Sequence, residues 1–140
     1  GFVDSTLQGN ERIKEAIHLF HQEQTNERYD LGCFAVRERM LCEGHLIFPA
    51  DIIESEDGST SFLFKTMECS GMDFLAAFTD REEYEKRPAS GAVSQFIDVM
   101  LENVMQQEDI AGMIINPWGE PFVLCKSDIA MIFGEEDISP

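Results

Sequence analysis

The chain changes its hydrophobic period twice, and this order of patterns limits the folds it can adopt. Apolar residues follow helical spacing up to about residue 43, alternate with polar residues after Gly44, and return to helical spacing over residues 94–107. Helical and strand patterns therefore occur in separate blocks. This grouping predicts an α+β domain with two N-terminal helices, an antiparallel sheet made of a meander and a C-terminal hairpin, and helices packed on the sheet.

The N-terminal block predicts two helices. The first covers residues 10–24, where Asn10 is a suitable N-cap. The second covers about residues 27–43, after a break with a new cap at Thr25, and Gly44 stands where a helix C-cap is common.

The alternating block predicts a three-stranded antiparallel meander. Its first strand begins at Leu46 and contains Pro49, which favours an edge strand or a bulge because proline cannot donate a ladder hydrogen bond. The pair Asp57-Gly58 indicates a tight hairpin turn. The returning strand includes residues 62–64, and the third strand covers residues 74–78.

The second half alternates helices with strands. A capping box formed by Thr79 and Glu82 predicts a short helix that Pro88 stops. A brief strand is expected before a clear amphipathic helix. The remaining elements are expected at residues 89–93 (strand), 94–107 (helix), 112–115 and 122–125 (hairpin), and from a cap at Ser127 to near Gly134 (helix).

The turn of the C-terminal hairpin is the candidate interaction surface. Asn and Pro suit the first two positions of a type I turn, and Gly119 could take a positive φ after it. Trp118, the single tryptophan, follows Pro117, and an exposed tryptophan often anchors a protein interface. The alternative is that its indole folds back onto the sheet. The predicted surface consists of Asn116, Pro117, Trp118, Gly119 and Glu120.

Charge narrows the choice of partner. The chain has 10 Lys and Arg against 27 Asp and Glu, a formal net charge of −17. Nucleic acids and anionic membranes are bound by clustered basic residues. Because acidic residues far outnumber basic ones in this chain, neither is expected as a partner. A protein or peptide partner is expected, a basic one being favoured by the acidic field, and self-association stays open.

Local chemical motifs do not point to a catalytic, cofactor or metal site. The four cysteines form no C-x-x-C pair, and we expect them to be reduced and mostly buried. His18 and His21 have helical spacing but lack a third ligand at a recognisable distance. Neither a nucleophile elbow nor a phosphate-binding loop occurs. We therefore expect no enzyme activity and no cofactor.

Length indicates one domain over residues 1–140, with a core over about 10–133. The ends, residues 1–9 and 135–140, are expected to be frayed. The first twenty residues contain charged side chains instead of an apolar secretion signal, which favours a cytoplasmic location.

Four segments in this order resemble the N-terminal domain of the bacterial SseB family. They are the leading helices up to Leu46-Ile47-Phe48-Pro49, the phrase from Phe74 to Asp80, the amphipathic helix from Phe96 to Asn103, and the strand–turn–strand from Ile110 to Glu120. The resemblance covers about residues 10–133. The family takes its name from an enhanced serine sensitivity phenotype, and some members are assigned to the secretion apparatus.

These observations together predict a non-enzymatic protein–protein interaction module of a small bacterial cytoplasmic protein. The family resemblance implies one alternative, a secretion-associated subunit or regulator. A further alternative is a small hydrolase whose site has no local signature, since residues far apart in sequence can meet in the fold.

Overall fold

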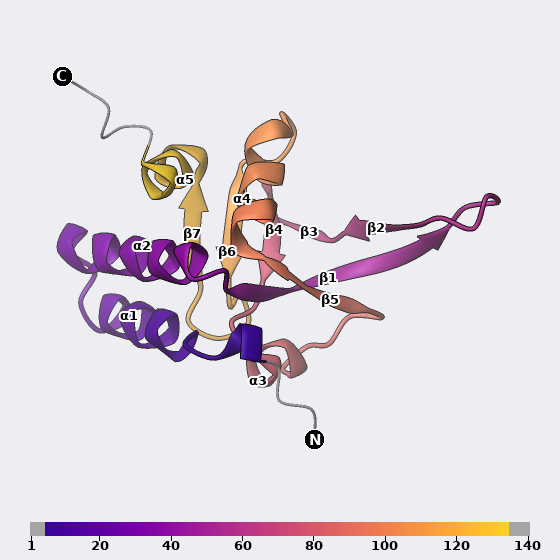
Figure 1. Cartoon of the computed structure of the whole chain (residues 1–140). Helices are drawn as coiled ribbons and strands as arrows, with labels where there is room; N and C mark the ends of the chain where they lie inside the picture. Colours follow the sequence, from indigo (N-terminus) through magenta and orange to yellow (C-terminus); the bar gives the residue numbers. More distant parts are fainter. Residues whose placement is uncertain (1–4, 135–140) are drawn as a thin grey trace.

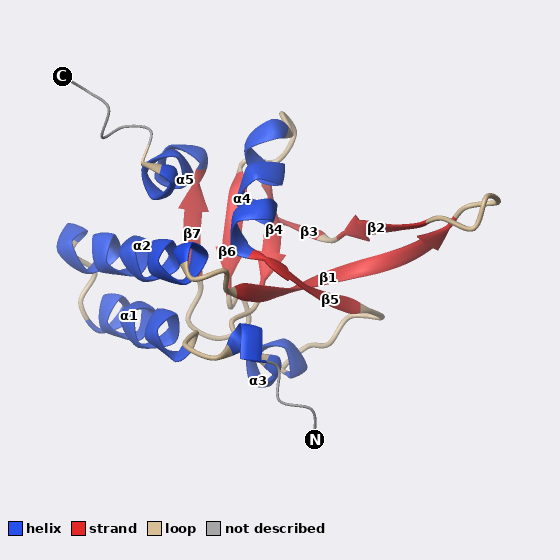
Figure 2. Ribbon diagram, in the orientation of Figure 1, coloured by secondary structure: helices blue, strands red, loops and turns tan. Residues whose placement is uncertain are grey.

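The computed structural model describes residues 5–134 and confirms the α+β class (Figures 1 and 2). A short 3₁₀ helix, η1 (Ser5–Leu7), precedes the helices. These are α1 (Glu11–Gln22), α2 (Asn26–Leu41), α3 (Arg81–Glu85), α4 (Ile97–Gln106) and α5 (Lys126–Phe133). The strands are β1 (His45–Glu54), β2 (Thr60–Phe64), β3 (Thr66–Cys69), β4 (Met72–Ala77), β5 (Ala92–Phe96), β6 (Gly112–Ile115) and β7 (Phe122–Cys125). Residues 1–4 and 135–140, which belong to the ends expected to be frayed, lie outside this range.

The strands form two sheets, in the orders β2-β1-β5 and β3-β4-β6-β7. The hairpin of β6 and β7 is confirmed with the predicted bounds. One pairing differs from the predicted antiparallel sheet, because β4 and β6 run parallel. Parallel neighbours need a long crossover, and the chain between them supplies α3, β5 and α4.

The two sheets separate at one proline. Lys65 stands alone between β2 and β3, and its N–H donates to the Pro49 carbonyl at 2.9 Å. Pro49 has no N–H to give back, and the Lys65 carbonyl accepts instead from Ala76 N at 3.5 Å. Pro49 therefore lies in the central strand β1, not at an edge or a bulge as predicted. It marks the place where the returning strand leaves β1 and joins β4.

The main core lies where α2, α4 and α5 pack together and against β6 and β7. Phe122 of β7 is fully buried, with its ring centroid 5.8 Å from that of Phe20 and 4.9 Å from that of Tyr29. A glycine makes this packing possible. A Cβ at Gly32 of α2 would lie 2.5 Å from the Phe122 ring.

The ends of α3 and α2 differ from the sequence prediction. Asp80, not Thr79, caps α3, since its carboxylate accepts from Glu83 N at 3.0 Å. At α2, Glu43 takes the left-handed conformation expected of a terminal glycine, with φ 60°, and Gly44 N donates to the Arg39 carbonyl.

The other differences concern α4 and α5. Helix α4 begins at Ile97 instead of residue 94, because residues 92–96 pair with β1 as β5. Helix α5 is not capped by Ser127. The Asp128 carboxylate accepts from Cys125 N at 2.9 Å and closes the first turn.

The outer part of the β1–β2 hairpin, residues 51–64, projects away from the helices, and we call it the arm (Figure 1). Its predicted turn is confirmed. Ser55 N donates to the Ser59 carbonyl at 2.9 Å, and Gly58 takes the positive φ of 87° that closes the turn.

Candidate functional site

The predicted turn forms at the end of β6. Gly119 N donates to the Asn116 carbonyl at 3.1 Å, as a tight turn requires. The positive φ belongs to Asn116, at 53°, and not to Gly119 as predicted. Asparagine tolerates this conformation better than most residues because its short amide can bond locally.

The Asn116 side chain faces the interior of the protein and is only 3% exposed. Its Oδ1 accepts from Thr79 N at 3.0 Å, and its Nδ2 lies 3.0 Å from Thr79 Oγ1. Its own N–H donates to the Ala77 carbonyl. These bonds tie the end of β6 to the segment after β4, which explains why Thr79 is buried and does not cap α3.

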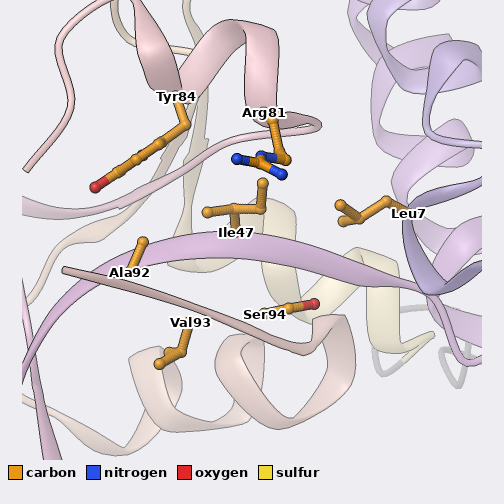
Figure 3. A pocket seen from close by; sticks show the side chains of 7 residues that line it. All are labelled: Leu7, Ile47, Arg81, Tyr84, Ala92, Val93 and Ser94. Atoms are coloured by element: carbon orange, nitrogen blue, oxygen red, sulfur yellow. The ribbon is translucent and has the colours of Figure 1, made fainter. Parts of the chain in front are cut away.

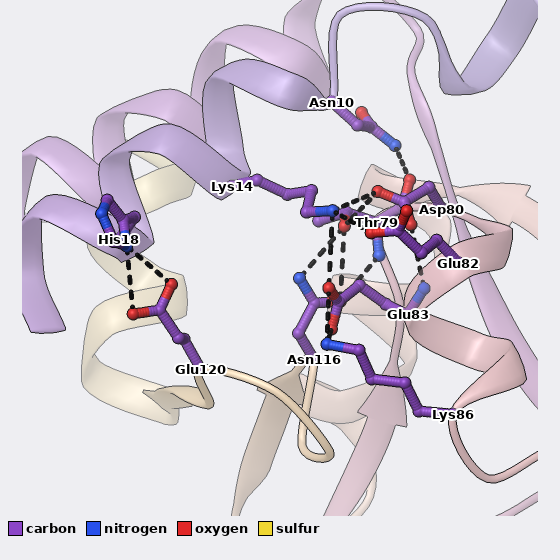
Figure 4. Close-up of polar contacts among 10 residues, drawn as sticks. All are labelled: Asn10, Lys14, His18, Thr79, Asp80, Glu82, Glu83, Lys86, Asn116 and Glu120. Carbon is purple, nitrogen blue, oxygen red and sulfur yellow. Dashed lines mark hydrogen bonds and ion pairs between the residues drawn. The ribbon is translucent and has the colours of Figure 1, made fainter.

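A second buried amide holds the same segment from the other side. Asn10 Nδ2 donates to the His45 and Thr79 carbonyls, each at 2.8 Å, and its Oδ1 accepts from Arg39 Nε. The side chain therefore makes no capping bond at the start of α1, where the sequence predicted one. It joins α1, α2 and β1 to the loop that precedes α3, and Figure 4 shows where Asn10 lies relative to Thr79.

Trp118 is half-buried, between the two arrangements considered for it. Its indole packs against the small cluster of Ile47, Ala76 and Phe78. The Arg87 guanidinium lies 5.1 Å from the ring centroid. Pro117 is also half-buried, whereas Gly119 and Glu120 are exposed. An interaction role for this turn stays a prediction.

A cluster of charged side chains lies under the turn (Figure 4). Glu83, 6% exposed, forms ion pairs with Lys14 at 3.4 Å and Lys86 at 3.0 Å. Lys14 also pairs with Asp80 at 3.2 Å. Burial lowers the pKa of Lys14, but the hydrogen bonds and negative charges of Asp80 and Glu83 outweigh it and raise the pKa. Gly119 packs directly on this cluster, since a Cβ there would lie 2.5 Å from Glu83 Oε1.

The two helical histidines bind the segment after the turn. His18 Nδ1 lies 3.0 Å from Glu120 Oε1, and His21 Nε2 lies 2.7 Å from the Pro121 carbonyl. Within residues 5–134, no group of three or more His, Cys, Asp or Glu side chains could hold a metal ion. The cluster and the histidines together fix the turn to α1 and α3.

The cysteines are less buried than predicted. All four are free thiols, but only Cys33 is buried, Cys69 is intermediate, and Cys42 and Cys125 are exposed. Cys125 lies within an apolar segment of the sequence, which predicts a buried side chain. It is the last residue of β7, and its neighbour Leu124 points to the core instead.

A cavity of about 400 Å³ lies between α3 and the ribbon of β1 and β5 (Figure 3). Ser94 lines it, and its Oγ lies 2.8 Å from His45 Nδ1. The other ring nitrogen, Nε2, is buried and has no hydrogen-bond partner in the described part of the chain. A serine nucleophile needs a histidine oriented by a third group, and none is present there. The lining residues are Leu7, Ile47, Arg81, Tyr84, Ala92, Val93 and Ser94.

The arm exposes four large apolar side chains, which sequence reasoning missed. Their exposed fractions are 60% for Ile52, 45% for Ile53, 39% for Phe62 and 58% for Leu63. Ile52 lies opposite Phe62 on one face, whereas Ile53 and Leu63 belong to the other. No local signal distinguishes these strands from covered ones, because β6 has a similar run of neighbouring apolar residues and is buried throughout.

Comparisons with protein families, with characterised proteins and with solved structures found no match. None of the helices between residues 5 and 134 is both long and apolar enough to span a membrane. The geometry of the described residues is therefore the basis for the functional argument.

Proposed function

We propose that this chain is a non-enzymatic protein–protein interaction module of a bacterial cytoplasmic protein, and that the arm is its contact element. The observation that carries the proposal is the exposure of four large apolar side chains on one projecting hairpin. Large exposed apolar side chains grouped on one element of a folded domain, here on both faces of the hairpin, typically mark an interaction site.

Charge on the arm supports a basic protein or peptide as the partner. Residues 51–64 contain four acidic residues and no Lys or Arg. Asp51 is paired with Lys65 at 3.1 Å, but Glu54 and Glu56 form no ion pair with any residue in 5–134. A positive group on a partner would therefore meet unpaired carboxylates beside the apolar side chains.

The predicted turn is less suited to be the main contact. Asn116 is buried, Trp118 is half-buried, and Glu120 already contacts His18. The arm instead offers Ile53 and Leu63, which are exposed and belong to neither buried cluster, and this makes it the better place to test the function.

The test compares what the chain captures from an extract of its source cells with what two double variants capture. Ile53→Ser with Leu63→Ser removes exposed apolar groups from the arm. Leu41→Ser with Val99→Ser is the matched control, because these side chains are 65% and 50% exposed but lie on α2 and α4. Bound proteins are measured by quantitative mass spectrometry.

We expect the control to retain the proteins bound by the unchanged chain and the arm variant to lose them. Equal retention by both variants would show that the arm is not the contact element. Absence of any enriched protein on the unchanged chain would contradict the interaction function itself.

A further inference from the structure

The arm also has a free backbone edge. Strand β2 is the outermost strand of its sheet, and within the described residues nothing pairs with its outer side. Hydrogen bonds at both ends of the hairpin fix which groups face outward. Lys65 N donates to Pro49 and Ser55 N donates to Ser59, so the odd-numbered residues of β2 bond to β1. The backbone N–H and C=O groups of Thr60 and Phe62 therefore point away from the sheet.

This edge lacks the features that normally protect an exposed strand. Proteins block such edges with charged side chains, prolines, bulges or covering loops. The sequence Thr60-Ser61-Phe62-Leu63-Phe64 contains no charge and no proline, and its register with β1 is continuous. An unprotected apolar edge is a template on which another strand can pair.

We propose that β2 binds its partner by strand addition, and that the added segment is extended, apolar in its centre and cationic at the end beside the hairpin tip. The inference rests on the proposed function and specifies how the partner binds. Backbone groups of Thr60 and Phe62 pair with the added strand, and its apolar side chains cover Phe62 and Leu63. Its Lys or Arg side chains lie beside Glu54, Glu56 and Asp57.

Charge argues against a second copy of this chain as the added strand. Pairing two copies through β2 would bring together two chains of net charge −17 each, with both acidic tips near the interface. Like charges at an interface oppose association, whereas a basic segment is attracted from a distance and binds more weakly as salt rises.

One substitution separates backbone pairing from side-chain contact. Thr60→Pro removes an outward N–H, and the bonds that β2 makes to β1 stay intact because Thr60 does not donate to β1. Thr60→Ala is the matched control, since it shortens the side chain but keeps the N–H. Phe62→Pro with Phe62→Ala provides a second pair at the next outward position, for use if Thr60→Pro lowers the melting temperature relative to Thr60→Ala.

The probe is a fluorescent peptide with three lysines followed by four valines, so that apolar side chains reach both faces of the hairpin, and its binding is followed by anisotropy. We expect Thr60→Pro to weaken binding by about tenfold or more, as loss of one interfacial hydrogen bond implies, and Thr60→Ala to change it little. A peptide with glutamates in place of the lysines should not bind. Light scattering of the chain alone should give a monomer.

Each contrary result has a distinct meaning. Equal binding by the proline and alanine variants overturns strand addition, and capture that still depends on Ile53 and Leu63 leaves the proposed function standing. No binding of the lysine peptide at about 1 mM also overturns the proposal. A dimer that Thr60→Pro converts to a monomer would identify a second copy as the occupant and overturn the basic partner.

Discussion

The two hairpins β1–β2 and β6–β7 have similar apolar strands, yet one is buried and the other is exposed. All four residues of β6 are buried, and Phe122 and Leu124 of β7 are fully buried. The outer part of β1 and most of β2 are exposed. The difference lies in their neighbours. Strand β6 lies between β4 and β7 with α4 against it and α5 against β7, whereas the arm extends beyond the helices (Figure 2).

This difference shows that an apolar strand defines a core only where other elements cover it. A strand that extends beyond the elements covering its sheet exposes its apolar side chains to solvent. Such side chains lower solubility unless a partner covers them. Mutations that remove apolar groups should therefore act on folding in the β6–β7 hairpin and on binding in the arm.

The largest expected effect is at the centre of the buried hairpin. Phe122→Ala removes a fully buried ring that touches Phe20 and Tyr29, and it should lower the free energy of unfolding by about 3–5 kcal/mol. Urea unfolding measures the loss. A loss below about 0.5 kcal/mol, the range of surface changes, would show that the β6–β7 hairpin is not core.

A smaller loss is expected at the turn of the same hairpin. Asn116→Ala leaves the buried Thr79 N–H without its acceptor, which should cost about 1–3 kcal/mol. Alanine at φ 53° adds backbone strain that glycine avoids, so Asn116→Gly should be more stable than Asn116→Ala by about 1 kcal/mol. Thermal unfolding of the pair checks both values, and equal stability of the two variants would contradict the strain argument.

High pH should lower the free energy of unfolding through two groups of α2, Tyr29 and Cys33. Burial, with the nearby Asp128 charge, raises the pKa of Cys33 from 9.0 to about 12, and burial with the Asp128 hydrogen bond raises the pKa of Tyr29. The unfolded chain therefore releases these protons first. Stability should be unaffected by them below about pH 9 and should fall from there to about pH 12, by up to about 1.4 kcal/mol per pH unit for each group.

The matched variant for this effect is Tyr29→Phe, which removes one of the two titrating groups, the one whose ring packs against Phe122. Its unfolding free energy should depend less steeply on pH above about 10 than that of the unchanged chain, whatever its absolute stability. An unchanged slope in the variant would show that Tyr29 does not contribute.

The smallest expected effect is in the arm. Leu63→Ala shortens a side chain that is 58% exposed, so the free energy of unfolding should change by no more than about 0.5 kcal/mol. Urea unfolding of Leu63→Ala and Phe122→Ala under the same conditions compares the two losses of unfolding free energy directly. A loss of 2 kcal/mol or more would mean that the arm packs against the body and that the two hairpins do not differ.

Local signals were sufficient for much of the fold. The Asn-Pro turn and the apolar runs beside it predicted β6 and β7, and Asp57-Gly58 predicted the tip of the arm. The parallel pairing of β4 with β6 had no such signal, because a crossover of 34 residues joins the strands. Long-range pairing depends on how whole elements pack and not on turn residues.

Long-range contacts also explain why parts of the candidate site could not be predicted from the sequence. Thr79 and Glu82 match a capping box, but Thr79 bonds to Asn116, 37 residues away, and leaves the cap to Asp80. The sequence predicted that Asn116 lies in a turn, but it did not predict that the side chain is buried. The exposure of the arm was equally hidden, since the sequence does not state how far β1 and β2 extend past the helices.

The hydrogen bond missing at Pro49 affects how the β1–β2 hairpin unfolds locally. Because Pro49 gives no bond to Lys65, the ladder is interrupted where the arm joins the body, and the strands on the two sides can separate one at a time. We expect amide protons of β2 that bond to β1 to exchange with solvent through local fraying of the hairpin, and those of β6 to exchange only when the core unfolds. The chain would then open in two cooperative units, because the arm can open and re-pair while the body stays folded.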